Sequence, residues 1–295
     1  MESKKKRKKK NLPLITGIIS VLCMTVSLAF CLYPAISSVA NNISNKNRNT
    51  DYLKTINTLS DFEKEQFLKD AQAYNDSLGE PLEYVSAFSY KTTSDYTDVL
   101  AFNDGQMASI KIPKINVDLP IYHGTGEDKL SKGAVHMPNT ALPIGGTGNH
   151  SAISAHTAYP AKVFFDDLDK LEIGDYFFIQ ILDETHTYEV TDKNIVEPND
   201  ISLLQSDHSK DLITLITCYP YAVNSHRLFV RGERVADNSD AVSLESVTAK
   251  YDYPYKNTLY FIAAALLVIT VIIIVILVIR RSKGKRKAQE EKQSR

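Results

Sequence analysis

Apolar and polar positions alternate in short runs through the middle of the chain, and this pattern predicts β-strands. From residue 107 onward, Gly, Pro, Asn or Asp bounds nearly every run, as expected of strands joined by tight turns. The expected strands cover residues 109–112, 117–122, 134–136, 151–156, 176–182, 187–192, 212–218 and 228–232. A short helix is expected over residues 163–171. Because no long helices separate the strands, the pattern favours a small all-β barrel.

The region before the strands has a helical period instead. Residues 61–78 place apolar side chains at helical spacing, with Ser60 or Asp61 as the N-cap and Gly79 as the stop signal, so they predict an amphipathic helix. Residues 41–60 are rich in Asn, Ser and Thr and are expected to form a polar linker. Residues 80–105 are expected to lead irregularly into the barrel.

Two long apolar stretches lie toward the ends of the chain. Residues 14–33 and 259–279 carry no charge, and each supplies the ~20 apolar residues that a transmembrane helix needs. Lys and Arg cluster at residues 4–10 and 280–287. The positive-inside rule therefore places both termini in the cytoplasm and residues 41–257 outside the cell. A cleaved signal peptide is the alternative for the first stretch, but its length and the lack of a clear Ala-x-Ala site favour an uncleaved anchor.

These patterns divide the chain into seven segments. The expected order is a basic cytoplasmic tail at 1–11, an N-terminal transmembrane anchor at 12–40, an extracellular linker and helix at 41–106, the β-barrel at 107–236, a juxtamembrane linker at 237–257, a C-terminal transmembrane helix at 258–279 and a second basic cytoplasmic tail at 280–295.

Charge is unevenly distributed along the chain. The formal net charge is −1, yet residues 1–11 and 280–295 hold 15 of the 34 Lys and Arg and only 3 of the 35 Asp and Glu. The middle keeps 19 basic and 32 acidic residues, a net charge of −13, which argues against a nucleic-acid-binding domain. The sequence has no phosphate-binding Gly motif and no Cys/His spacing typical of zinc.

Cys218 is the only cysteine outside the apolar end stretches, and it ends the strand-like run at 212–218. A thiol with an ordinary pKa is only ~3% thiolate at neutral pH, so a nucleophilic cysteine needs a cation or a base beside it. Arg227 opens the next strand, and a loop over 219–226 would bring it close to Cys218. On spacing alone, a buried inert Cys218 and a solvated Arg227 explain the pattern equally well.

Several separated motifs resemble the sortase family. Thr-Leu-Ile-Thr-Cys at 214–218 matches the Thr-Leu-x-Thr-Cys signature of sortases, and 219–234 is similar to the stretch that follows the cysteine in class C, pilin-type sortases. Further similarity to class C lies at 112–115, 119–125, 149–156 and 164–171. The sequence departs from the family at Ala155-His156-Thr157, where Gly-His-Arg is usual, and at 219–222, where Tyr-Pro-Tyr-Ala replaces Thr-Pro-Tyr-Gly.

The resemblance implies a closed eight-stranded sortase-type β-barrel with short helices, in addition to the N-terminal helix and two transmembrane helices. It makes Cys218 the nucleophile, His156 the catalytic histidine and Arg227 the oxyanion or substrate-positioning cation. His150 competes for the histidine role because it also stands in a class C-like position. Phe88 is the candidate lid residue, although the Asp-Pro-aromatic lid anchor of many class C enzymes is missing.

The implied activity is cysteine transpeptidation without a cofactor or a metal. The enzyme would cleave LPXTG-like sorting signals of surface or pilin proteins and transfer the acyl group to an amine, typically a pilin lysine in class C. Two alternatives remain open at the level of sequence. One is a sortase that anchors proteins to a cell-wall precursor, and the other is a non-catalytic, membrane-tethered binding module.

Overall fold

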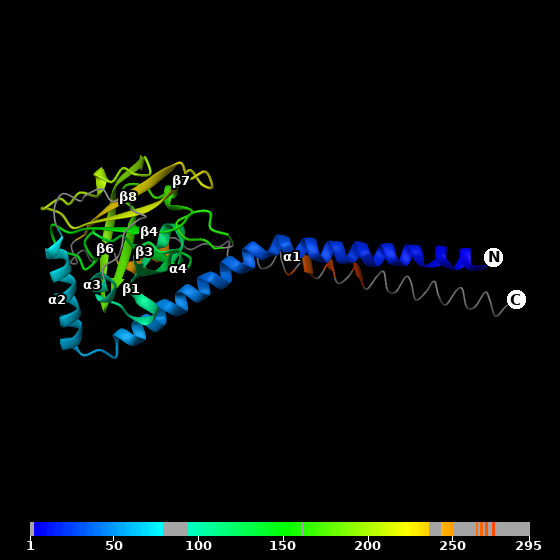
Figure 1. Ribbon diagram of the computed structural model, residues 1–295, viewed down its shortest axis with the longest axis horizontal. Helices are drawn as coiled ribbons and strands as arrows, with labels where there is room; N and C mark the ends of the chain where they lie inside the picture. The colour runs from blue at the N-terminus through cyan, green and yellow to red at the C-terminus, as the bar shows by residue number, and fades with distance from the viewer. Residues whose placement is uncertain are drawn as a thin grey trace. The chain divides into compact units, whose positions relative to one another are not determined.

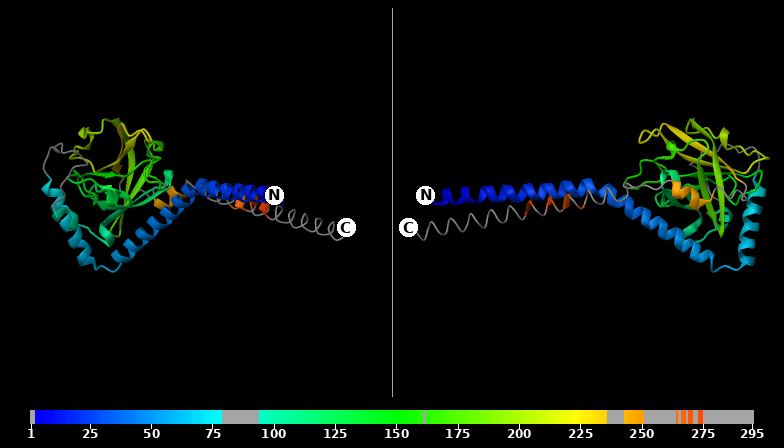
Figure 2. Two further views of the ribbon diagram at one scale, coloured as in Figure 1. Left: turned by 45° about the vertical axis from the view of Figure 1, so that its right-hand side comes forward. Right: turned by 180° about the vertical axis from the view of Figure 1, so that it is seen from behind.

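The computed structural model describes residues 3–78, 94–160, 162–235 and 243–250, together with 264, 266, 267, 269, 270, 273 and 274. The chain divides into two units, Met1–Tyr251 and Asp252–Arg295. The first unit contains a β-barrel with helices beside it (Figures 1 and 2). The predicted C-terminal transmembrane helix at 258–279 falls in the second unit, and most of its residues lie outside the described ones.

Eight strands form a closed barrel, as the resemblance implied. They are β1 (Gln106–Ile112), β2 (Val117–His123), β3 (Ala134–His136), β4 (His150–Ser154), β5 (Tyr176–Ile181), β6 (Glu184–Val196), β7 (Leu212–Tyr219) and β8 (His226–Arg234). Their order around the barrel is β1-β2-β3-β4-β7-β8-β6-β5. The β2–β3 and β4–β7 pairs are parallel and the other pairs are antiparallel. Closure leaves no open sheet edge.

The predicted helix over 163–171 is wrong except for one 3-10 turn, η3 (Leu168–Lys170). The carboxylate of Asp166 accepts hydrogen bonds from the backbone N–H groups of Ala158 and Phe164, at 2.9 and 2.8 Å. These local side-chain bonds compete with helical hydrogen bonding. They fold the segment into a turn, which lets Phe164 and Phe165 enter the core with no exposed surface.

A stacked pair of aromatic side chains lies in the core of the barrel. The rings of Phe177 and Tyr188 stack with centroids 5.4 Å apart and planes 8° from parallel. Gly232 makes this possible, because a Cβ there would lie 2.4 Å from Cε1 of Phe177. A real side chain at this position would therefore force the stacked pair apart.

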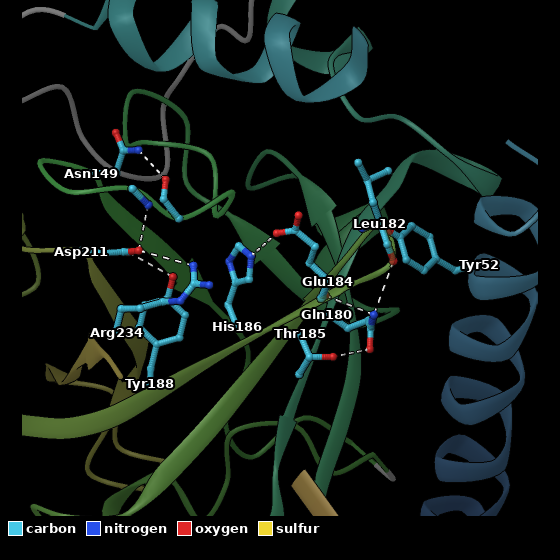
Figure 3. Close-up of polar contacts among 12 residues, drawn as sticks. Tyr52, Asn149, Gln180, Leu182, Glu184, Thr185, His186, Tyr188, Asp211 and Arg234 are labelled. Carbon is cyan, nitrogen blue, oxygen red and sulfur yellow. Dashed lines mark hydrogen bonds and ion pairs between the residues drawn. The ribbon is translucent and has the colours of Figure 1, made fainter. Parts of the chain in front are cut away.

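A buried polar cluster lies at one end of the barrel (Figure 3). Asp211, just before β7, accepts hydrogen bonds from the Gly146 N–H at 2.8 Å and the Tyr188 hydroxyl at 3.1 Å, and Arg234 at the end of β8 lies 3.6 Å away. Burial raises the pKa of Asp211, and its hydrogen bonds and Arg234 oppose that rise. Since Cys218 and Arg227 occupy the other ends of β7 and β8, this cluster is a structural feature far along the strands from them.

Helices complete the first unit. They are α1 (Ser3–Ile56), α2 (Asp61–Ser77), α3 (Ser94–Asp98), α4 (Glu127–Leu130) and α5 (Leu244–Lys250), with further 3-10 turns η1 (Asn103–Gly105), η2 (Pro113–Ile115) and η4 (Ser202–Leu204). The predicted helix over 61–78 is confirmed as α2. Ser60 is its N-cap and forms a capping box with Glu63, an arrangement that satisfies two backbone donors at the helix start.

The polar linker predicted at 41–60 is wrong for most of its length, because α1 continues as a helix to Ile56. Tyr52 and Ile56 are fully buried. The Tyr52 hydroxyl donates to the Met107 carbonyl at 3.0 Å and accepts from the Leu182 N–H at 2.8 Å. The amide of Asn49 donates to Asp118 at 2.5 Å and accepts from Gln106 at 2.9 Å. The polar residues of this segment therefore fasten α1 to the barrel.

Among the described residues, no single helix is both long and apolar enough to cross a bilayer. Two helical pieces, Leu22–Cys31 and Ile36–Ile56, meet at a bend of 41° and satisfy the length and composition criteria only when taken together. The two predicted transmembrane helices therefore remain predictions.

Candidate active site

Cys218, His156 and Arg227 occupy neighbouring positions along three consecutive segments of the barrel, β7, the loop after β4, and β8. In the antiparallel β7–β8 pair, Cys218 lies directly opposite Arg227. In the parallel β4–β7 pair, Ser154 lies opposite Ile216, and the Thr217 hydroxyl donates to the Ala155 carbonyl at 2.9 Å. His156, the next residue, therefore comes level with Cys218. The order β4-β7-β8 therefore puts the position of Cys218 between those of His156 and Arg227.

The Cys218 thiol is free and half-buried. A fully buried thiol would be inert, and a fully exposed one would lack a shaped environment. Its neighbour Arg227 is held by its own loop, because Nη1 donates to the carbonyls of Asn224 and His226 at 3.3 and 3.0 Å. These bonds place a fixed positive charge on the strand beside the thiol.

An apolar groove runs beside Arg227. Its walls come from the loop after β2, α4, β3, β4, the β6–β7 connection, β7 and β8. The lining residues are Thr125, Leu130, Val135, Met137, Ser154, Pro198, Asp200, Ile201, Leu204, Ile216, Arg227 and Phe229. We call this hollow the Arg227 groove. Its walls are mainly apolar, and Asp200 and Arg227 are the charged residues that line it.

His156 lies two residues beyond β4, in the loop that follows it. Its side chain is 28% exposed, and its Nε2 lies 3.2 Å from Oε2 of Glu127, the first residue of α4. The ring packs against that of Tyr159, with centroids 4.9 Å apart. Its backbone carbonyl accepts from the Phe165 N–H at 3.0 Å. The contacts with Glu127 and Tyr159 therefore orient the imidazole, which stays accessible to solvent.

The competing histidine, His150, has a different environment at the other end of β4. It is 2% exposed. Its Nδ1 lies 2.9 Å from the Gln205 carbonyl, and its Nε2 lies 2.8 Å from the Thr214 hydroxyl. Burial lowers its pKa, although the bond to Gln205 opposes that effect. With both ring nitrogens engaged and only 2% of its surface exposed, His150 has the surroundings of a structural residue.

Sequence reasoning missed Glu127 and Tyr159, although both contact His156. Tyr159 lies only three residues after His156, which is a weak signal, and nothing in the spacing links Glu127 to position 156. Phe88, the candidate lid residue, lies outside the described residues. Within the described part of the chain, no group of three or more His, Cys, Asp or Glu side chains is arranged to hold a metal ion.

Comparison with known proteins agrees with the barrel and its motifs. The sequence model of the sortase domain family matches residues 110–235. The curated protein Sortase D of Bacillus subtilis (strain 168) is 33% identical over 135 residues, which cover 44% of this chain and 65% of the relative. The chain thus matches just under two thirds of the length of that relative.

Two solved structures match over nearly their whole length. Sortase C of Streptococcus pneumoniae is 37% identical with a TM-score of 0.59, covering 64% of this chain and 96% of that one. Sortase C1 of Streptococcus agalactiae is 39% identical with a TM-score of 0.58, covering 64% and 98%. These structural matches confirm the resemblance to class C sortases. The chain belongs to the sortase family of cysteine transpeptidases.

Proposed function

We propose that this protein is a membrane-anchored transpeptidase that cleaves an LPXTG-like sorting signal and joins the released acyl group to an amine, a pilin lysine. One observation carries the proposal. Cys218 on β7 lies opposite Arg227 on β8, His156 in the loop after the neighbouring β4 comes level with Cys218, and Arg227 lines an apolar groove. A nucleophile, a proton carrier and a fixed cation within one site are the groups that acyl transfer through a thioester needs.

The first half-reaction follows from this arrangement. The Cys218 sulfur attacks the carbonyl of the scissile Thr–Gly peptide bond, forming a C–S bond. Arg227, opposite Cys218 across the β7–β8 pair, stabilises the negative charge on the tetrahedral intermediate. The C–N bond then breaks, and His156 passes the proton from the thiol to the leaving glycine amine. The result is a thioester on Cys218.

The Arg227 groove supports a peptide substrate with apolar residues before the cleavage site. Ile201 and Leu204 supply one wall, and Ile216 and Phe229 another. The leucine and proline of a sorting signal would bury apolar surface there, with a contribution of about 25 cal/mol per Å² removed from water. The acyl donor would therefore be held by its side chains while its scissile carbonyl reaches Cys218.

The proposed acceptor is a pilin lysine, because the close structural matches include sortase C proteins, one of them from a study of pilin substrate specificity. The apolar residues 22–31 of α1 support a membrane anchor by their composition, and Tyr52 and Ile56 further along the helix pack on the barrel. A membrane-tethered enzyme would meet membrane-tethered substrates. Transfer to a cell-wall precursor is the competing outcome, and the acceptor assay below separates the two.

The test is mass spectrometry of the full-length protein in detergent, incubated with a peptide that carries Leu-Pro-x-Thr-Gly. The wild type should gain the mass of the acyl fragment on Cys218, whereas Cys218→Ala should gain none while it keeps the wild-type circular dichroism spectrum. A lysine peptide from a pilin should release the adduct faster than a cell-wall peptide. Turnover by Cys218→Ala would contradict the mechanism, and the opposite acceptor preference would replace pilin assembly by wall anchoring.

A further inference from the structure

Glu127 contacts His156 but has no role in the proposed acylation. The Glu127 side chain is 65% exposed even though its Oε2 lies 3.2 Å from His156 Nε2. Leu130, three residues along the same short helix, lines the Arg227 groove, whereas Glu127 does not. The carboxylate is therefore open to solvent beside the proton carrier, outside the groove assigned to the acyl donor.

An aromatic face adjoins the same imidazole. Tyr159 packs on His156 with ring centroids 4.9 Å apart and is supported from another side by Phe164, 5.7 Å away. The ammonium of Lys162 lies 5.6 Å from the centre of the Tyr159 ring, within the range of a cation–π contact. This part of the molecule therefore already accommodates one primary ammonium, supplied by the chain itself.

The pKa of Lys162 shows how the surroundings of Tyr159 affect an ammonium group. Burial lowers its pKa, the nearby Arg48 lowers it further, and Glu127 opposes both effects. Its Nζ donates to the Ser131 carbonyl, so the lysine is held on the α4 side. An incoming ammonium would thus meet attraction from Glu127 and an environment that eases the loss of a proton.

We propose that Glu127 and Tyr159 form the binding site for the acceptor, a protonated primary amine on a flexible side chain, and deliver it to His156. This inference rests on the proposed function. The carboxylate attracts and orients the ammonium, the ring covers one side of it, and His156 takes its proton. The acyl donor and the acceptor then occupy separate places, one in the Arg227 groove and one at Glu127.

The second half-reaction balances with these groups. The ammonium loses one proton to His156 and becomes a nucleophilic amine, which forms a C–N bond to the thioester carbon. The tetrahedral intermediate then loses the second amine proton to solvent through Glu127, and the C–S bond breaks. The products are an amide, the Cys218 thiolate and protonated His156. No oxidant, reductant or metal is needed for this step.

The experiment compares two nucleophiles on one acyl-enzyme. Full-length wild type, Glu127→Gln and Asp128→Asn are acylated with the sorting-signal peptide and then offered either a lysine peptide or hydroxylamine, which is uncharged at neutral pH. Asp128 is the matched control, since it is an exposed carboxylate on the same helix. The measured quantity is the rate of amide formation divided by the rate of hydroxamate formation.

Glu127→Gln should lower this ratio by about tenfold, the scale of one charge-assisted hydrogen bond, and Asp128→Asn should leave it within about twofold of wild type. An equal fall with both nucleophiles would overturn the acceptor site, because Glu127 would then only orient His156. An unchanged ratio would also overturn it. A wild type that forms no thioester would instead contradict the proposed function.

Discussion

Cys218 and Arg227 are brought together by a single cross-strand pairing, which fixes what each can do. Directly opposite residues of an antiparallel pair have Cα atoms only ~4.5–5.5 Å apart. A guanidinium presents a planar set of donors in a rigid fork. Because Nη1 is already fixed to the Asn224 and His226 carbonyls, little reorganisation is needed when negative charge develops on the substrate.

Replacement of Arg227 by lysine tests this role. Arg227→Lys keeps a positive charge but loses the planar donors, so we expect normal folding and peptide binding with turnover reduced by about 10²–10³-fold, the usual effect of removing an oxyanion donor. The measurements are kcat and KM for peptide cleavage and the melting temperature of the variant. The loss should fall mainly on kcat.

Arg231 is the matched control, because it lies four residues further along β8 and forms an ion pair with Asp192. Arg231→Lys should retain turnover close to that of the wild type. A nearly fully active Arg227→Lys beside an inactive Arg231→Lys would show that the functional cation had been assigned to the wrong residue.

The residues of the site were predictable from sequence to different degrees. The pairing of Cys218 with Arg227 follows from two adjacent strands and a short loop, so local spacing was enough to suggest it. His156 reaches Cys218 through the parallel β4–β7 pair, which joins segments about 60 residues apart, and only the family resemblance pointed to it. Glu127 enters from a third segment, and no local pattern could reveal that contact.

Among the elements, the strands were predictable and the end of α1 was not. Each strand has a short apolar run with turn residues beside it. The apolar/polar alternation and the turn residues therefore predict the same strand. Residues 41–56 instead carry Asn, Ser and Thr, which suggest a loop when read locally. The side chains of Asn49 and Tyr52 form hydrogen bonds with Asp118, Gln106, Met107 and Leu182. Tertiary hydrogen bonds therefore determine the structure of this segment.

Removal of the Tyr52 hydroxyl tests how strongly its hydrogen bonds attach α1 to the barrel. Tyr52→Phe keeps the shape of the side chain but leaves the buried Leu182 N–H and Met107 carbonyl without this partner. We expect the free energy of unfolding to fall by about 1–3 kcal/mol, measured by urea denaturation of the full-length protein in detergent. Peptide turnover per folded molecule should be unchanged.

Tyr221→Phe is the control for this prediction. Tyr221 is 61% exposed in the β7–β8 loop, so the loss of its hydroxyl should change stability by no more than about 0.5 kcal/mol. Equal stability of Tyr52→Phe and the wild type would mean that the apolar contacts of Tyr52 and Ile56 alone attach the helix.

At the scale of the whole molecule, the charge asymmetry and α1 bear on where the protein resides. The basic ends and the acidic middle fit a chain whose ends face the cytoplasm and whose barrel faces outward. α1 joins the apolar residues 22–31 to Tyr52 through a bend of 41° between Cys31 and Ile36, so an anchor there would be linked to the barrel by a short helical connection. We therefore propose that the barrel is held outside the cell, close to its tethered substrates.

Cys218 provides the test of this topology, because it is the only cysteine outside the apolar stretch that holds Cys23 and Cys31. A membrane-impermeant maleimide should label the half-buried Cys218 thiol in intact cells, and the label should disappear in Cys218→Ala. Epitope tags at either end of the chain should be digested by protease only after the cells are permeabilised. Labelling that needs permeabilised cells would place the barrel inside. Tags cleaved in intact cells would reverse the orientation of that end, since each basic cluster would then lie on the outer side despite the positive-inside rule.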